Sequence, residues 1–267
     1  MRIVRFIDEQ GQVQFGHDYG EGSAELLEGE LLTGLKRTHR RVAVTKLLAP
    51  LEPRAILCIG LNYRKHAAEM GSPLPEHPVL FMKNPAALNH PDDAIVIPSC
   101  CEEVEQVDYE AELAVVIGSR AKDVRPGVAL EHVLGYTAGN DVSARHWQKN
   151  LGGGQWIRGK SFDGFCPLGP VLVTPDEIPN PQALTVSASV NGEVVQESNT
   201  SDMIFSVAEL ISQLSQGMTL LPGTVILTGT PSGVGAGRTP PVFLKPTDVV
   251  EIKIGSIGTL RNPVRGE

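Results

Sequence analysis

Short apolar runs separated by turn-forming residues dominate the sequence from residue 55 to the C-terminus. Each run has the length of a strand, and each is bounded by glycine, proline, asparagine or aspartate. Helical periodicity covers only residues 62–70 and 203–217, so a repeated β-α-β arrangement around a parallel sheet is not expected. The runs are AILCIG, PVLFMK, AIVIP, LAVVIG, PVLVT, LTVSASVNGEVV, TVILTG and VVEIKI. The pattern predicts an α+β fold that consists mostly of strands.

Residues 1–50 differ in character from the rest of the chain. Apolar and polar residues alternate over residues 3–17 around a glycine-containing turn, as in a β-hairpin, and a polar, acidic stretch follows. A chain of 267 residues suits one sizeable domain with a small appendage. We therefore expect a small N-terminal β module over residues 1–50 and one larger domain over residues 51–267.

Charge and cysteine usage narrow the class of protein. The net charge is −8, and no basic stripe with interleaved aromatic residues is present, which argues against nucleic-acid binding. No apolar run is long enough for a signal peptide or a membrane span. The four cysteines show no C-x-x-C spacing, which indicates reduced thiols without a zinc site. We expect a cytoplasmic protein whose partners are small molecules.

Two glutamates interrupt the apolar run VDYEAELAVVIG at residues 107–118. Side chains alternate between the faces of a strand, so Glu110 and Glu112 point the same way. An exposed strand edge would explain the pair equally well, but a third acid, Asp141, follows another apolar segment in YTAGNDVSAR. Like charges at close range oppose folding unless a cation lies between them. Three hard oxygen ligands suit Mg²⁺ or Mn²⁺, and Ca²⁺ is possible.

A histidine and a glutamate lie three residues apart in NYRKHAAEM. If residues 62–70 form a helix, His66 and Glu69 share one face. A carboxylate beside an imidazole orients the ring and stabilises its protonated form, which suits a base that removes a proton from water or from an acidic C–H. The same spacing is also common on exposed helices without any catalytic role.

Two glycine-rich segments resemble nucleotide-binding motifs. GQWIRGKS at 154–161 fits the phosphate-loop pattern, but neither the preceding strand nor the following helix is expected there. Lys160 remains a candidate positive charge facing an anionic substrate. TGTPSGVGAG at 228–237 follows a strand-like run but is followed by prolines instead of a helix. We expect this loop to offer backbone N–H groups and the Thr230 hydroxyl to an anion.

Seven motifs in order make the chain resemble the fumarylacetoacetate hydrolase family from about residue 55 to the C-terminus. They are IGLNYRKHAAEM, PVLFMKNPAAL, VDYEAELAVVIG, GNDVSARHWQ, GKSFDGFCPLGP, VNGEVVQESNTSDMIF and LTGTPSGVG. The segments VSARHWQ, GKSFDGFCPLGP and TPPVFLKPTD are most similar to the branch called fumarylacetoacetate hydrolase domain-containing protein 2 and its bacterial relatives. The resemblance implies a mixed β-roll for residues 51–267, usually as a homodimer.

The resemblance also implies roles for individual residues. The ligands of an Mg²⁺ or Mn²⁺ ion would be Glu110, Glu112 and Asp141. A lid that orders over the substrate would carry the catalytic pair His66 and Glu69, which act with Lys160. The substrate contacts would be Lys83, Arg145, Gln148 and Thr230. Several relatives have Asp where this chain has His146, a change that bears on how the neighbouring arginine is held.

The substrates of the family share a 2-oxo acid unit, which a metal ion polarises so that an enolate can form. The branch resembled implies an oxaloacetate keto–enol tautomerase. Two alternatives use the same residues: hydrolysis of acylpyruvate or fumarylpyruvate-type β-diketo acids, and decarboxylation of oxaloacetate. A phosphate-loop nucleotide-binding protein and a non-catalytic binder of small molecules are the alternatives from other classes.

Overall fold

The computed structural model describes residues 1–267, in which strands outnumber helices. The strands are β1 (Arg2–Ile7), β2 (Val13–Gly20), β3 (Ser23–Glu30), β4 (Gly34–Ala43), β5 (Lys46–Leu48), β6 (Ala55–Gly60), β7 (Val79–Lys83), β8 (Leu88–Asn89), β9 (Ile95–Ile97), β10 (Val107–Asp108), β11 (Ala111–Ile117), β12 (Val133–Asn140), β13 (Ser143–Ala144), β14 (Cys166–Val173), β15 (Thr185–Val190), β16 (Glu193–Asn199), β17 (Thr224–Leu227), β18 (Val249–Ile254) and β19 (Gly258–Gly266). The α-helices are α1 (Arg64–Glu69), α2 (Ile157–Lys160) and α3 (Val207–Ser215). The prediction of a mostly β fold is confirmed, and α1 and α3 lie in the two segments predicted to be helical.

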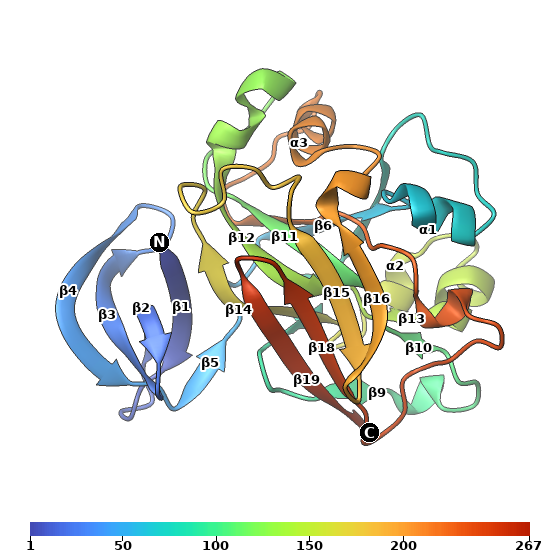
Figure 1. The fold of residues 1–267 in the computed structure, drawn as a ribbon, viewed down its shortest axis with the longest axis horizontal. Coiled ribbons are helices and arrows are strands. Elements are labelled where there is room, and N and C mark those ends of the chain that lie inside the picture. Colours follow the sequence, from blue (N-terminus) through green and yellow to red (C-terminus); the bar gives the residue numbers. More distant parts are fainter.

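Two sheets form the body of the protein. The larger has the order β4-β3-β2-β1-β14-β12-β11-β17-β6-β7 with β5 and β8 at its side, and the smaller has the order β16-β15-β18-β19-β9. Most neighbouring strands of the larger sheet are antiparallel, but β17 pairs with β6 in parallel, so this sheet is mixed. In Figure 1 the smaller sheet lies in front of β11, β12 and β14. Apolar side chains of both sheets join one core, in which every residue of β11 is buried.

The N-terminal strands extend the larger sheet. The predicted hairpin is present, because β1 and β2 pair antiparallel from Ile3 opposite His17 to Ile7 opposite Val13. The other edge of β1 pairs with β5 and β14. Figure 1 shows β1 to β5 side by side at one end of the molecule, away from α1 and α2. The division at residue 50 remains a prediction.

A buried asparagine anchors the short connection between β6 and α1. The side-chain amide of Asn62 donates to the carbonyl oxygens of Phe205 (3.0 Å) and Thr228 (2.7 Å) and accepts from the Phe205 N–H (2.8 Å). The residue has no solvent exposure, so water cannot replace these bonds. Asn62 therefore holds the start of the α1 segment against the loop that follows β17.

None of the helices is both long enough and apolar enough to cross a membrane. The four cysteines are free thiols, and only Cys100 is exposed.

Candidate active site

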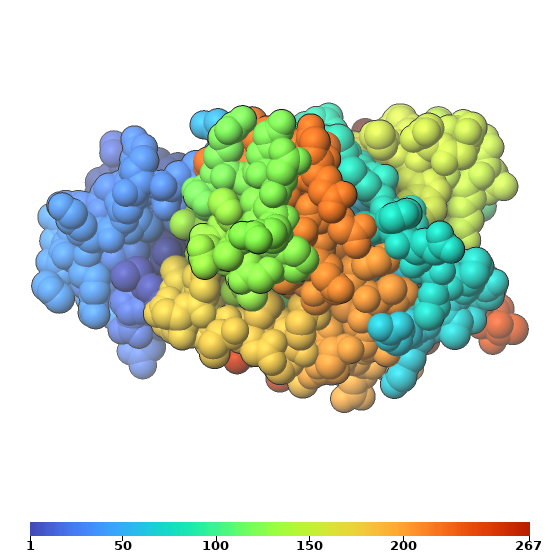
Figure 2. Space-filling model, turned by 90° about the horizontal axis from the view of Figure 1, so that it is seen from above, coloured from blue at the N-terminus to red at the C-terminus, as the bar shows by residue number.

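A cavity of about 290 Å³ has His66 of α1 and Lys160 of α2 in its lining. In Figure 1 both helices lie at the end of the molecule away from the N-terminal strands. Seven of the ten predicted site residues line the cavity: His66, Glu110, Glu112, Arg145, Gln148, Lys160 and Thr230. Figure 2 shows the surface beside it, where the turquoise segment that follows β6 meets the yellow-green segment near residue 150. Glu69, Lys83 and Asp141 do not line the cavity: Lys83 and Asp141 are fully buried, and Glu69 is half-buried beside His66.

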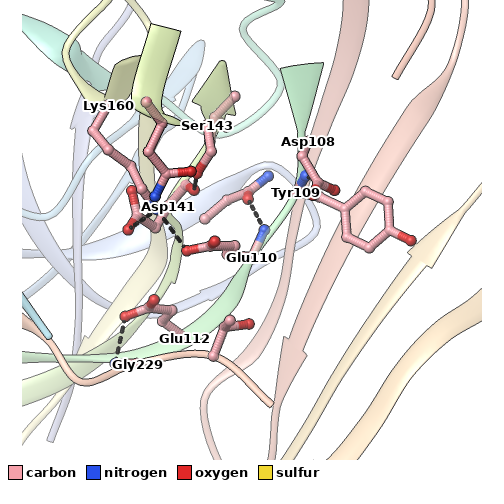
Figure 3. A network of polar contacts seen from close by, with 12 residues as sticks. Asp108, Tyr109, Glu110, Glu112, Asp141, Ser143, Lys160 and Gly229 are labelled. Carbon is pink, nitrogen blue, oxygen red and sulfur yellow. Dashed lines mark hydrogen bonds and ion pairs between the residues drawn. The ribbon is translucent and has the colours of Figure 1, made fainter. Parts of the chain in front are cut away.

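The pairing of β11 with β12 brings the three predicted ligands together. Ala111 lies opposite Asn140, so Glu110 just before β11 and Asp141 just after β12 are neighbours. The Asp141 N–H donates to the Glu110 carbonyl oxygen (3.0 Å). Each carboxylate has an oxygen within 4.8 Å of the others. Figure 3 shows the three side chains pointing toward one another, with Lys160 between Glu110 and Asp141.

The pKa values of the two buried glutamates in this cluster shift in opposite directions. Burial and the charges of Asp141 and Glu110 raise the pKa of Glu112 well above its usual value. The only hydrogen bond of the Glu112 carboxylate comes from the Gly229 N–H (2.7 Å). Burial would raise the pKa of Glu110 as well, but the positive charges of Lys160 and Arg145 lower it to about 2. Glu112 is therefore the member of the cluster that lacks a cationic partner.

A hard divalent cation fits this donor set. All three side chains offer carboxylate oxygens, which Mg²⁺, Mn²⁺ and Ca²⁺ prefer, and both Glu110 and Glu112 reach the cavity. A bound cation would also compensate the charge of Glu112, whose burial is otherwise costly. The prediction that these residues hold a metal ion therefore fits the geometry, while the identity of the ion remains a prediction.

Two lysines neutralise the cluster from the protein side. Lys160, at the end of α2, places Nζ 2.7 Å from Glu110 Oε2 and 2.8 Å from Asp141 Oδ2. Lys83, at the end of β7, places Nζ 2.6 Å from Asp141 Oδ1 and donates to the carbonyl oxygens of Val142, Phe165 and Lys160. The prediction that Lys83 contacts substrate remains a prediction, which the structure does not favour because these acceptors enclose its ammonium group outside the cavity lining. Lys83 holds Asp141, one of the three predicted metal ligands, in place.

Replacing Lys83 with methionine should therefore destabilise the whole protein. The change keeps most of the side-chain volume but leaves Asp141 Oδ1 and three carbonyl oxygens without the Lys83 donor. We expect the free energy of unfolding to fall by about 3–5 kcal/mol, measured by urea denaturation. The matched control is Lys253→Met on the exposed side of β18, which should change it by less than about 0.5 kcal/mol. Equal unfolding midpoints for the two variants would contradict this role.

The loop after β17 binds side chains of the protein itself. Its backbone N–H groups donate to three carboxylates: Gly229 to Glu112 (2.7 Å), Gly233 to Glu69 (2.8 Å) and Gly235 to Asp108 (2.8 Å). Gly229 and Gly233 have φ angles of +99° and +103°, which other residues rarely adopt. The predicted anion-binding loop is thus present, but its anions are internal carboxylates. Thr230 lines the cavity, and its hydroxyl donates to the Ala111 carbonyl oxygen (3.1 Å).

Asp108 is a site residue that the sequence analysis missed. Its carboxylate accepts from Arg145 Nε (2.8 Å), lies 2.7 Å from Arg145 Nη2, and accepts from the N–H groups of Gly235 and Ala236. Arg145 Nη1 lies 2.7 Å from Glu110 Oε1 and donates to Gln148 Oε1 (3.1 Å). Asp108 therefore fixes the arginine against the carboxylate cluster. The sequence did contain an indication of this role, because Asp108 precedes Glu110 by two residues, the same interval that separates Glu110 from Glu112.

The predicted histidine–glutamate pair is formed in α1. His66 Nδ1 lies 2.9 Å from Glu69 Oε2, and the other Glu69 oxygen accepts from the Gly233 N–H. Burial raises the pKa of Glu69, but the hydrogen bonds from His66 and Gly233 outweigh it and lower the pKa. An ionised Glu69 makes Nδ1 the protonated nitrogen, which leaves Nε2 of His66 free to accept a proton in the cavity.

The phosphate-loop alternative is not supported. α2 contains four residues and ends at Lys160, so no helix follows the lysine. The ammonium group of Lys160 is buried against Glu110 and Asp141, where it cannot face a phosphate chain.

Residues 55–265 match the family described as fumarylacetoacetate (FAA) hydrolase C-terminal, so the chain belongs to this family. The mitochondrial oxaloacetate tautomerase fahd2 of Xenopus laevis is 50% identical over 219 residues, 82% of this chain and 68% of the relative. The mitochondrial oxaloacetate tautomerase FAHD2A of Bos taurus is 45% identical over 247 residues, 92% of this chain and 77% of the relative. Among solved structures, 5-carboxymethyl-2-hydroxymuconate delta-isomerase from Mycobacterium smegmatis is 39% identical, with a TM-score of 0.85 over 100% of both chains. The predicted family and its β-roll are confirmed.

Proposed function

We propose that this protein is an oxaloacetate keto–enol tautomerase that requires Mg²⁺ or Mn²⁺. The observation that carries the proposal is that Glu110 and Glu112 of the carboxylate cluster line the same small cavity as His66 of the His66–Glu69 pair, although the two groups come from distant parts of the chain. The relatives from Xenopus laevis and Bos taurus, both named oxaloacetate tautomerases, support it.

The arrangement suits proton transfer between carbon and oxygen. A divalent ion held by Glu110, Glu112 and Asp141 would polarise the 2-oxo group and make the neighbouring C–H acidic. His66 Nε2 takes the proton from C3 and returns it to the oxygen on C2, so keto and enol forms interconvert without net loss of any atom. Glu69 stabilises the imidazolium while it carries the proton. Lys160 and Arg145 add positive charge beside the enolate oxygen and the substrate carboxylate.

Ultraviolet loss of enol-oxaloacetate and cleavage of acetylpyruvate, measured side by side with Mg²⁺, test the proposal. We expect rapid loss of the enol with little cleavage. Efficient cleavage of acetylpyruvate would instead assign the site to C–C bond hydrolysis, in which His66 activates water. Release of CO₂ from oxaloacetate at the rate of enol loss would assign it to decarboxylation.

Three further properties belong to the same proposal. Removal of metal with EDTA should abolish turnover, and Mg²⁺ or Mn²⁺ should restore it. A homodimer is proposed, and light scattering measures it. The cytoplasmic location expected from the sequence remains a prediction, because the relatives named above are mitochondrial.

A further inference from the structure

Four basic side chains line the cavity, and three of them are already engaged by protein groups. Lys160 contacts Glu110 and Asp141, and His66 contacts Glu69. Arg145 directs Nε and Nη2 to Asp108 and Nη1 to Glu110 and Gln148. The fourth, Lys149, lines the same cavity but makes no ion pair or side-chain hydrogen bond with any residue. Lys149 is therefore the one basic side chain of the cavity lining without an ion-pair partner in the protein.

The position of Lys149 is set by a short π-helix over Trp147–Leu151. π-helical turns are rare and occur frequently at functional sites. Gln148, the preceding residue in this turn, is buried and accepts from Arg145, so the turn is anchored to the arginine. Lys149 itself is exposed and lines the cavity.

No carboxylate of the protein forms an ion pair with Lys149. The only acidic residues that line the cavity are Glu110 and Glu112, and Glu110 already contacts Lys160 and Arg145. Partial burial and the charge of Arg145 lower the pKa of Lys149, and the charges of Asp108 and Glu110 compensate this only in part. An anionic group of a ligand would supply that compensation.

We infer that Lys149 binds the second carboxylate of the substrate and so selects four-carbon dicarboxylic 2-oxo acids over their monocarboxylic analogues. The inference rests on the proposed function, because the first carboxylate and the 2-oxo group are assigned to the metal-binding end of the cavity. A solvated surface lysine with no role in binding is the alternative. Discrimination between mono- and dicarboxylic ligands separates the two.

The variants are Lys149→Gln, which removes the charge, and Lys149→Arg, which restores it. Lys253→Gln on β18 is the matched control, since it removes the same charge from an exposed site outside the cavity. With enol-oxaloacetate, we expect Lys149→Gln to raise KM about five- to tenfold and change kcat less than about twofold. Lys149→Arg should recover most of the affinity, and Lys253→Gln should match the unaltered protein.

Calorimetric binding of malate and lactate, in the presence of Mg²⁺, provides a readout that does not need turnover. These unreactive 2-hydroxy acids differ by one carboxylate at the distal carbon. Lys149→Gln should weaken malate binding about five- to tenfold and leave lactate binding unchanged. An unchanged malate-to-lactate affinity ratio would overturn the inference, whether both affinities stay constant or both fall. If the unaltered protein has no activity on oxaloacetate, the proposed function fails while this ratio still tests Lys149.

Discussion

Glu112→Gln should give a folded protein that no longer binds Mg²⁺ or Mn²⁺ and that loses more than about a hundredfold in turnover. Glutamine keeps the shape of the side chain but offers one neutral oxygen in place of a carboxylate. Glu112 has no cationic partner in the protein, so the substitution leaves no buried lysine or arginine without its counter-charge. It also removes the repulsion from Asp141 and Glu110, so the metal-free variant should unfold at a higher denaturant concentration than the unaltered metal-free protein.

The matched control is Glu197→Gln on the exposed side of β16, which should change neither metal binding nor turnover. Calorimetric titration of EDTA-treated protein measures the binding, and urea denaturation without metal measures the stability. Millimolar or tighter Mg²⁺ binding by Glu112→Gln, equal to that of the unaltered protein, would show that Glu112 is not a ligand.

His66→Ala separates metal binding from proton transfer. The variant should bind Mg²⁺ normally, because His66 contacts Glu69 and none of the three carboxylates of the cluster. Turnover of enol-oxaloacetate should fall between about a hundredfold and ten-thousandfold, the usual contribution of a positioned general base. Glu69→Gln should lose less, because the imidazole remains present but loses the carboxylate that holds its tautomer.

His39→Gln supplies the control, since this histidine is exposed on β4 in the N-terminal part of the sheet. Steady-state kinetics and calorimetry on the same preparations give turnover and metal affinity together. If His66→Ala retained near-normal turnover, the base would have to be another group.

The alternation of side chains on a strand was enough to predict the glutamate pair. Residues 110 and 112 share a face in any strand, but the spacing left an exposed edge equally possible. In the structure Glu110 lies just before β11 and Glu112 within it, and both are buried. The meeting with Asp141 depends on the antiparallel register that places Ala111 opposite Asn140. Spacing along the chain does not encode that register, so the proximity of the third acid was a hypothesis that only the fold could test.

The sequence was least informative about residues whose roles depend on contacts between distant segments. Lys83 resembles a substrate contact in sequence, but the fold encloses its ammonium group among carbonyl oxygens from two other segments and Asp141. Asp108 was overlooked because its importance depends on Arg145 and on the loop after β17. The glycines of that loop predicted an anion site correctly, but only the structure shows that the anions are carboxylates of the protein.

Exchange of the C3 protons of oxaloacetate in D₂O, followed by nuclear magnetic resonance, tests the central claim most directly. The account predicts that the protein with Mg²⁺ accelerates incorporation of deuterium at C3 well above the uncatalysed rate without forming pyruvate, and that EDTA or His66→Ala abolishes the acceleration. Exchange at the uncatalysed rate, or deuterium incorporation only as pyruvate forms, would contradict it.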